Sequence, residues 1–283
     1  MNVIEIKKYI EQLFIDDYFF NNHCYIVGGF VRDILLGNSP KDIDIIVDKH
    51  HGSLKLALMI YDKLSSFVSK PRRLGNYPIW QITFISGKFK GENIEIAESM
   101  TEIFPNNLSR QRIVKYASLK EDIYRRDFTI NSLLMKFNKG ETIESIIDIS
   151  NYGLNDLLYN KIIRCIPNIN AEEILYADPL RILRAIRFSI RYNYNIDEKT
   201  LEAMKKVANR INILSSERIY EELKLIGSYK KGILKCIIIL NKIDALKYIF
   251  PEIEKLKYIK QAPDIRLIHV EGSKYHCKNF ESI

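Results

Sequence analysis

The feature that most constrains this chain is a pair of glycines, Gly28 and Gly29, followed closely by two aspartates, Asp42 and Asp44, that alternate with isoleucine. A short apolar run precedes the glycines, a helical pattern follows them, and a fully apolar run follows the aspartates. Because side chains two apart on a strand face the same way, the aspartates project together while the isoleucines point into a core. The pattern therefore predicts a strand, a helix and a second strand that carries two carboxylates side by side.

This combination favours a site for phosphate chemistry. Two neighbouring carboxylates attract Mg²⁺, which phosphoryl-transfer sites hold with one or two carboxylates and the substrate's phosphates. Gly28 and Gly29 let the backbone approach a ligand, the helix that begins there directs free N–H groups toward an anion, and Arg32 is expected to reach the same phosphates. Each part alone is an ordinary turn or solvated strand, but the order and spacing together favour a site. The chain has no G-x-x-x-x-G-K-[ST] sequence, so this is not a P-loop.

The rest of the chain changes character near its middle. Residues 79–85 and 93–97 supply two more β-rich runs, whereas most of the chain from about residue 141 has helical spacing. The helical patterns cover residues 3–20, 174–190, 199–207, 216–226 and 233–249. The predicted fold class is therefore α+β, with a mixed sheet and helices in an N-terminal head and an all-helical remainder.

Composition limits the class of protein. The chain is 47% hydrophobic and 28% charged, which is typical of a globular protein, and its net charge of +8 suits a polyanionic partner such as nucleic acid or nucleotide phosphate. The strongest uninterrupted apolar run, residues 236–240, is far shorter than the roughly 20 residues of a membrane span, and no signal-peptide pattern opens the chain. The four cysteines are dispersed, with no C-x-x-C pair. We expect a cytoplasmic protein with reduced thiols and no membrane partner.

Further motifs give the chain a family resemblance. Residues 125–131 read Arg-Arg-Asp-Phe-Thr-Ile-Asn, and residues 177–188 read Ala-Asp-Pro-Leu-Arg-Ile-Leu-Arg-Ala-Ile-Arg-Phe. With the glycine and aspartate motifs, they resemble the class II CCA-adding tRNA nucleotidyltransferase and bacterial poly(A) polymerase family, within the polymerase-β nucleotidyltransferase superfamily. Weaker similarity at residues 148–164 and 216–223 extends the match. The resemblance implies a catalytic nucleotidyltransferase head at residues 1–140, a helical neck for base selection at 141–210, and a helical RNA-binding body with a short tail at 211–283.

The resemblance also implies roles for residues of the head. Asp42 and Asp44 match the two aspartates that bind two metal ions, here Mg²⁺, and activate the 3′-hydroxyl of the RNA. We nominate Glu95, in a neighbouring strand pattern, as a third carboxylate ligand. Arg126 and Asp127 match the motif that contacts the ribose of the incoming nucleotide. Gly28, Gly29 and Arg32 match the nucleotide-binding turn.

The segment that begins at Asp178 carries the expected base selection. With Asp178 as helix N-cap and Pro179 in the first position, Arg181, Arg184, Arg187 and Arg191 fall within about a third of the helix circumference, and no acidic residue lies between the first and the last. Such a basic stripe favours a phosphate or base partner. The resemblance implies that Asp178 and Arg181 hydrogen-bond the edge of CTP or ATP, with Arg184 and Arg187 as further nucleotide contacts.

Two departures from the family pattern affect the expected substrate. Ala177 stands where the family usually has Glu or Asp, which weakens the expectation of strict selection between C and A. Residues 97–121 are about as long as the family's flexible loop, which enzymes restricted to adding CC lack or shorten, so the resemblance implies that addition of A is possible. The chain end resembles the opening of an HD phosphohydrolase-like domain, but it lacks a His-Asp pair, so His269 and His276 are expected not to bind metal.

Four functions stay open at this point. The first is a template-independent enzyme that adds CCA to the 3′ end of tRNA from CTP and ATP. The second is an A-adding tRNA nucleotidyltransferase or a poly(A) polymerase. The third is a catalytically inactive RNA-binding protein, which intact Asp42 and Asp44 disfavour, and the fourth is a nucleotidyltransferase for another substrate. A short tail is expected to weaken or alter the recognition of RNA.

Overall fold

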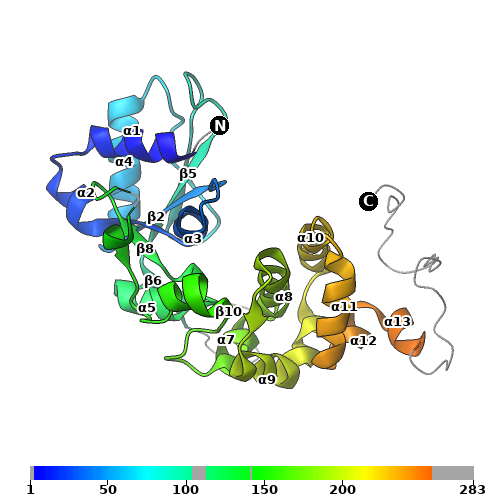
Figure 1. The fold of residues 1–283 in the computed structure, drawn as a ribbon. Helices are drawn as coiled ribbons and strands as arrows, with labels where there is room; N and C mark the ends of the chain where they lie inside the picture. The colour runs from blue at the N-terminus through cyan, green and yellow to red at the C-terminus, as the bar shows by residue number, and fades with distance from the viewer. Residues whose placement is uncertain (1–2, 104–112, 141, 257–283) are drawn as a thin grey trace. The chain divides into compact units, whose positions relative to one another are not determined.

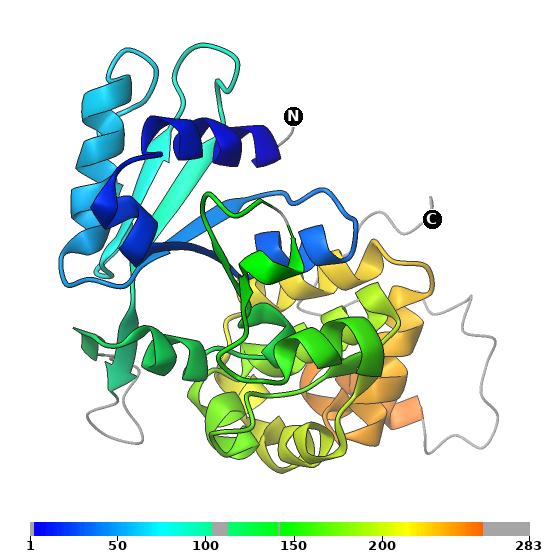
Figure 2. The same ribbon diagram turned by 60° about the vertical axis from the view of Figure 1, so that its left-hand side comes forward.

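The computed structural model describes residues 3–103, 113–140 and 142–256, which fold as two compact units (Figures 1 and 2). Unit 1 comprises residues 1–160 with 166–168, and unit 2 comprises residues 161–165 and 169–283. An α+β head followed by a mostly helical part confirms the expected fold class.

Unit 1 is built on a seven-stranded mixed sheet in the order β3-β4-β5-β2-β1-β8-β9. β2 pairs in parallel with β5, and the other neighbours pair antiparallel. The strands are β1 (Cys24–Val27), β2 (Ile43–Val47), β3 (Arg72–Arg73), β4 (Ile79–Thr83), β5 (Asn93–Glu98), β8 (Leu134–Lys136) and β9 (Ile146–Ile147). The predicted strands at residues 25–27, 42–47, 79–85 and 93–97 are thus confirmed, and the aspartate-bearing strand lies at the centre of the sheet.

Helices cover both faces of this sheet. α4 (Gly52–Leu64) packs against β2, β4 and β5, and α5 (Leu119–Tyr124) contributes Ile123 to a buried cluster with Ile46 on β2. The other helices of the head are α1 (Val3–Leu13), α2 (Tyr18–His23) and α3 (Gly29–Leu35). The expected single helix over residues 3–20 was wrong, because the Asp17 carboxylate accepts a hydrogen bond from Phe20 N (2.7 Å) and starts a second helix.

A separate two-stranded hairpin leads into α5. Its strands are β6 (Met100–Ile103) and β7 (Ile113–Tyr116), and residues 104–112 between them lie outside the described residues. The stretch expected to match the family's flexible loop therefore contains a paired hairpin. α5 then begins with a capping box in which Ser118 and Glu121 satisfy each other's backbone N–H groups.

The division between the units lies later in the chain than the predicted boundary at residue 140. β9 pairs with β8, so the segment after residue 141 continues the sheet of unit 1. Asp156, fully buried, accepts a hydrogen bond from Thr129 Oγ1 (2.8 Å) and fixes this segment to the head. The short elements here are η1 (Thr129–Asn131), η2 (Ile143–Ser145), α6 (Gly153–Asn155) and the π-helical η3 (Asp156–Asn160). The separation of a neck from a body at residue 210 stays a prediction.

Unit 2 is mainly helical. Its helices are α7 (Ala171–Ala177), α8 (Leu180–Tyr192), α9 (Glu198–Val207), η4 (Ala208–Ile213), α10 (Ser216–Gly227), α11 (Gly232–Lys242), α12 (Leu246–Ile249) and α13 (Pro251–Leu256), with the short parallel strands β10 (Ile162–Ile163) and β11 (Asn195–Ile196). The predicted helices over residues 174–190 and 233–249 are each two helices. The first breaks at Asp178, whose backbone is extended before Pro179.

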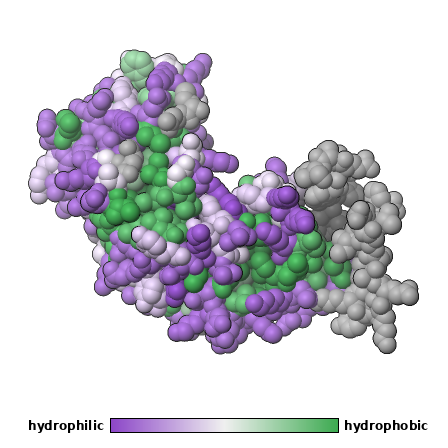
Figure 3. Space-filling model, in the orientation of Figure 1, coloured by the Kyte–Doolittle hydropathy of each residue, from purple (hydrophilic) through white to green (hydrophobic). Residues whose placement is uncertain are grey.

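The surface and the cysteines agree with the composition. Figure 3 shows hydrophilic residues over most of the face drawn, with hydrophobic residues gathered in places in both units. No helix of the described residues is long and apolar enough to cross a membrane. Cys24, Cys165 and Cys236 are buried and free, while Cys277, like His269 and His276, lies outside the described residues.

Candidate active site

The paired aspartates lie where the sequence pattern placed them. Asp44 is in β2 and Asp42 directly precedes it, and both are exposed. Ile43 and Ile45 are each 1% exposed and belong to the core on the other face. The alternation is therefore confirmed, and the central strand of the sheet presents two carboxylates on one face.

A polar row extends from Asp44 across three neighbouring strands. Asp44 on β2 is the direct partner of Glu95 on β5, Glu95 of Gln81 on β4, and Gln81 of Arg72 on β3. Arg72 Nη2 donates to Gln81 Oε1 (2.9 Å), and Gln81 Nε2 donates to Glu95 Oε1 (3.4 Å). Directly opposed side chains on one face of a sheet interact, so this row links the aspartates to the edge strand. It also directs one oxygen of Glu95 toward Gln81.

The charges around Asp44 are crowded. The pKa of its carboxyl is raised to about 6, first by loss of water to the surrounding protein and then by the negative charge of Glu95, with a smaller contribution from Asp42. The positive charge of Arg126 acts in the opposite direction. Because the side chain is also exposed, the crowded negative charge can be relieved by a cation from solvent.

This carboxylate pair fits a divalent metal ion that a substrate helps to hold. Oxygen donors suit Mg²⁺, and the negative charges of Glu95 and Asp42, which contribute to the raised pKa of Asp44, would favour a bound cation. Among the described residues, no group of three His, Cys, Asp or Glu side chains lies close enough to hold a metal ion. Glu95 is adjacent to Asp44 but does not complete such a group, so the two aspartates would bind a metal together with oxygen atoms of a substrate.

The glycine turn brings a second part of the site close. Gly28 has φ +73°, a left-handed conformation that favours glycine, and its N–H donates to the carbonyl of Leu133 (3.3 Å). A Cβ at Gly28 would lie 3.9 Å from Arg126 Nη1 and 3.9 Å from the carbonyl oxygen of Asn131. The turn therefore packs directly against the Arg-Arg-Asp-Phe-Thr-Ile-Asn segment.

Arg32 and Asp127 belong to one buried hydrogen-bond network. Arg32 is 5% exposed, and it donates through Nε to Asp33 (3.1 Å) and through Nη1 to Asn131 Oδ1. Asn131 Nδ2 in turn donates to Asp127 Oδ1 (3.0 Å), which also accepts from Phe128 N (2.8 Å). The structure thus joins two of the sequence motifs through Asn131. We expected Arg32 to reach the phosphates of a ligand. In the structure its side chain is buried, and its hydrogen bonds to Asp33 and Asn131 hold the glycine turn in place.

Arg126 is held by a residue that the sequence analysis did not select. Arg126 donates through Nε (3.2 Å) and Nη2 (2.9 Å) to Oδ2 of Asp122, which is fully buried. Its Nη1 atom faces the turn at Gly28, and its positive charge lowers the pKa of Asp44. Arg126 therefore lies beside the glycine turn and acts on Asp44 through its charge, and its contact with a nucleotide stays a prediction.

In unit 2, Asp178 and Arg181 are both partly engaged at the break between α7 and α8. The carboxylate of Asp178 accepts hydrogen bonds from Arg218 Nη2 (3.0 and 3.2 Å) and from Leu180 N (3.2 Å). Arg181 Nη1 donates to the carbonyl of Ile174 (3.0 Å), near the end of α7. α8 begins at Leu180 and its N-cap is Pro179. Asp178 lies one residue before the N-cap and still accepts a hydrogen bond from the first residue of the helix.

The basic stripe of α8 is only partly exposed. Arg184 is half-buried with its guanidinium 5.4 Å from the ring centre of Phe188. Arg187 is 8% exposed, and its Nε donates to Glu222 Oε2 of α10 (2.7 Å). At about 100° per residue, Arg187 lies at the edge of the basic arc next to the buried Leu183, and α8 packs against α10. The predicted nucleotide contact at Arg187 is therefore replaced in this structure by an ion pair that joins two helices.

Replacing Arg187 with methionine is expected to lower the free energy of unfolding by about 3 kcal/mol, because Glu222 would keep a buried charge without its partner. The double variant Arg187→Met/Glu222→Leu is expected to recover most of that loss. Urea titrations of the single and double variants measure both effects. Wild-type stability in Arg187→Met would contradict the structural role.

Sequence reasoning missed the residues that hold others in place. Asp122, Arg218 and Glu222 bind Arg126, Asp178 and Arg187 respectively. Asp122 carried a signal, because it lies three and four residues before two arginines in a helical pattern. The partners across helices are 35 and 40 residues apart, and no local spacing indicates them.

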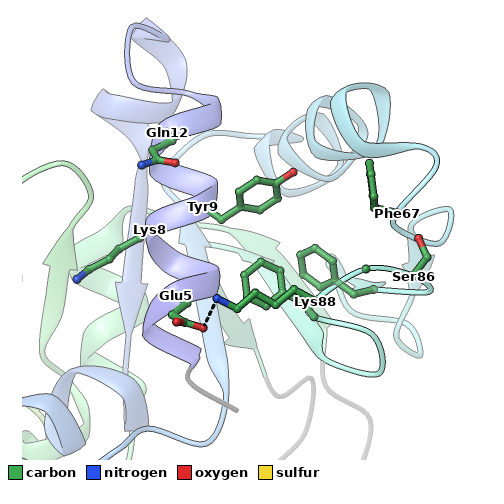
Figure 4. A pocket seen from close by; sticks show the side chains of 10 residues that line it. Glu5, Lys8, Tyr9, Gln12, Phe67, Ser86 and Lys88 are labelled. Atoms are coloured by element: carbon green, nitrogen blue, oxygen red, sulfur yellow. Dashed lines mark ion pairs between the residues drawn. The ribbon is translucent and has the colours of Figure 1, made fainter.

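A hollow elsewhere on unit 1 is separate from these residues. Figure 4 shows its lining, which comes from α1, from Phe67 and from the β4–β5 connection around Phe84 and Phe89, with an ion pair between Lys88 and Glu5 (3.1 Å). None of the residues selected from the sequence lines it. It therefore adds nothing to the candidate site.

Comparison with known families agrees with this division of the chain. Residues 24–164 match the model described as the poly(A) polymerase head domain. Residues 193–257 match the model described as the probable RNA- and SrmB-binding site of polymerase A. The first match contains the glycine turn, the aspartates and the Arg126 segment, and the second begins after α8.

Individual proteins are similar over most of the chain. An A-adding tRNA nucleotidyltransferase of Geobacter sulfurreducens is 32% identical over 81% of this chain and 24% of its own length. A CCA-adding enzyme of Lactococcus lactis subsp. cremoris is 32% identical over 91% of this chain and 58% of its own length. The solved structure of a Thermotoga maritima CCA-adding enzyme with tRNA superposes with a TM-score of 0.67 at 29% identity, covering 88% of this chain and 53% of that one. The chain thus spans between 24% and 58% of the length of these relatives.

Proposed function

This chain belongs to the poly(A) polymerase head-domain family, and from that premise we propose that it is a template-independent nucleotidyltransferase that adds CCA, from CTP and ATP, to the 3′ end of tRNA. The observation that carries the proposal is the pair of exposed carboxylates at the start of β2, Asp42 and Asp44, together with the charge of Arg126 that acts on Asp44. Similarity to a CCA-adding enzyme solved with tRNA supports the choice of substrate.

In the proposed reaction the head holds the reacting groups. Asp42 and Asp44 would hold Mg²⁺ with phosphate oxygens of the nucleotide, and the metal would polarise those oxygens and favour ionisation of the RNA 3′-hydroxyl. The triphosphate would bind beside the turn at Gly28, where the left-handed backbone without a Cβ leaves the Arg126 guanidinium close to the main chain. Arg126 and Asp127 bind the ribose, with the buried Arg32 and Asn131 holding Asp127 in place.

Base selection is assigned to unit 2. A carboxylate and a guanidinium together match donor and acceptor patterns on a base edge, so Asp178 and Arg181 can select C or A without a nucleic acid template. Arg218 supports this role because it binds both oxygens of Asp178 and limits its rotation. Arg184 is retained as a further nucleotide contact, whereas Arg187 acts through the packing of α8 on α10.

The rate of transfer is expected to fall as the pH drops through about 6. Ionised Asp44 is the form that binds a cation, and its pKa is raised to about 6, so protonation in this range empties the site. In Glu95→Gln the like charge beside Asp44 is lost, and the acid limb should move to lower pH. Initial rates measured from pH 5 to 8 give the acid limb of the pH profile for the wild type and for Glu95→Gln. Identical limbs for wild type and Glu95→Gln would contradict the assigned cause.

The proposal is tested by incubating the purified chain with Mg²⁺, CTP, ATP and three tRNAs that end before CCA, after C and after CC. Sequencing of the 3′ ends then reads the product. A single CCA on all three RNAs is the expected result. No extension of any RNA would refute a nucleotidyltransferase active on tRNA.

Addition of A alone is the second candidate. An A-adding enzyme and a CCA-adding enzyme are equally similar to this chain at 32% identity, and Ala177 departs from the family pattern beside Asp178. A single A added only to the CC-ended tRNA would establish this alternative, and a long A tract would indicate a poly(A) polymerase.

We place either activity in the cytoplasm, because the described cysteines are free and buried.

A further inference from the structure

Asp122 is a fully buried carboxylate whose two oxygens bind different parts of unit 1. Oδ2 accepts from Arg126 Nε and Nη2 at 3.2 and 2.9 Å. Oδ1 accepts from Arg125 Nε and Nη2 at 3.0 and 2.7 Å, and from the backbone N–H of Met100 at 3.2 Å. Charge-assisted bonds of this kind are strong and directional, so Asp122 fixes two guanidinium groups and one backbone segment at once.

The two oxygens serve different purposes. On the Oδ1 side, Arg125 Nε also donates to the carbonyl of Met100 (2.8 Å), so this side fastens the first residue of β6 to α5. On the Oδ2 side, Arg126 is held so that its Nη1 lies 3.9 Å from the Cβ position at Gly28. The base of the hairpin and the arginine beside the glycine turn therefore share one anchor.

The charge balance keeps this anchor ionised. Burial alone would raise the pKa of the Asp122 carboxyl, but the positive charges of Arg126 and Arg125 and their hydrogen bonds lower it below its usual value. Asp122 is thus a permanent anion at neutral pH. Its pairing with two arginines leaves one positive charge in excess, and the charge of Arg126 lowers the pKa of Asp44.

We propose that Asp122 is a positioning residue for nucleotide binding, which holds the Arg126 guanidinium against the glycine turn and ties that position to the base of the β6–β7 hairpin. This inference rests on the proposed function, because Arg126 is the residue expected to contact the ribose. It adds a residue that touches no substrate and acts only through Arg126. Loss of Asp122 therefore weakens nucleotide binding and the preference for ribose over deoxyribose, and changes kcat much less.

The test compares Asp122→Asn with two controls in the full chain. Glu121→Gln removes one negative charge from the same helix without touching either arginine. Arg125→Gln removes the Arg125 bonds to Asp122 and to the Met100 carbonyl, and it leaves the bonds of Arg126 and of the Met100 N–H to Asp122 in place. Steady-state rates with ATP, CTP and their 2′-deoxy forms give KM, kcat and the ribose preference, and calorimetric titration with ATP gives Kd without turnover.

For Asp122→Asn we expect KM and Kd for ATP about tenfold higher, a ribose preference about tenfold lower and a kcat within about threefold of wild type, since one lost charge-assisted contact corresponds to roughly that factor. Both controls should keep the wild-type KM and ribose preference. An Asp122→Asn variant with a lowered Tm but wild-type KM, Kd and ribose preference would overturn the proposal and leave Asp122 a purely structural residue.

A second variant covers the case in which Asp122→Asn does not fold. Asp122→Asn/Arg125→Gln removes one buried cation along with the anion, and its difference from Arg125→Gln alone isolates the arm that holds Arg126. The same tenfold change is expected, and no difference between the two would refute the proposal. If the wild-type chain adds no nucleotide, the proposed function fails while the calorimetric Kd still decides the role of Asp122. A wild-type chain without affinity for ATP would overturn both.

Discussion

Asp44→Asn is expected to abolish nucleotide transfer, by roughly 10³-fold or more, and to leave the chain folded. A metal ion contributes several kcal/mol to the stabilisation of a phosphoryl-transfer transition state, and each 1.36 kcal/mol corresponds to a factor of ten in rate. The amide keeps the size of the carboxylate but loses the charge. Asp42→Asn should behave in the same way, because both side chains lie on the exposed face of the sheet.

The same substitution should raise the thermal stability slightly. Burial and the nearby charges of Glu95 and Asp42 raise the pKa of Asp44, so its ionised form is held in the folded chain at a cost above pH 6. A neutral side chain removes that cost. The matched control is Asp62→Asn, which makes the same change at an exposed position of α4 and should retain full activity. Activity of Asp44→Asn within about threefold of wild type would refute the metal assignment.

The second large effect is expected from Asp178→Ala. The discrimination of CTP and ATP against GTP and UTP should fall by about 10- to 100-fold, because a bidentate contact to a base edge provides about 1–3 kcal/mol of selectivity. The overall rate with a mixture of nucleotides should fall less. Sequencing of 3′ ends after incubation with all four nucleotides measures the selectivity directly.

Two controls separate base reading from helix packing at this position. Arg218→Ala removes the partner of Asp178 and should give a smaller loss of selectivity, since the carboxylate stays but rotates more freely. Glu173→Ala removes an exposed carboxylate from α7 and should have no effect. If Asp178→Ala keeps wild-type selectivity, the base is selected by other residues.

The sequence predicted the chemically active residues of the head better than the residues that hold them in position. Alternation of Asp42 and Asp44 with buried isoleucines is a local property of one strand, so it could be read from period two alone. The place of Glu95 opposite Asp44 depends on the pairing of two strands 50 residues apart, and its approach to Gln81 could not be derived from spacing. The result is a carboxylate that was correctly placed beside the aspartates but does not complete a group of three.

In unit 2 the helical period predicted the apolar side of α8 correctly. Ile182, Leu183, Ile186 and Ile190 are all buried. The period could not show that Arg187 would face α10, because its position at the edge of the basic arc fits either solvent or a buried partner. Similarly, the spacing over residues 174–190 hid the break at Asp178-Pro179, since two helices in succession can keep the same apolar pattern.

The measurement that tests the central claim most directly is the stoichiometry of pyrophosphate release. The wild-type chain is incubated with Mg²⁺, CTP, ATP and a tRNA that lacks CCA, and with the same tRNA whose 3′-hydroxyl has been removed. We predict one pyrophosphate per nucleotide added to the first RNA and none with the second, because the carboxylate pair on β2 serves attack by that hydroxyl. Pyrophosphate release that is equal for both RNAs, or extension of neither, would contradict a nucleotidyltransferase centred on Asp42 and Asp44.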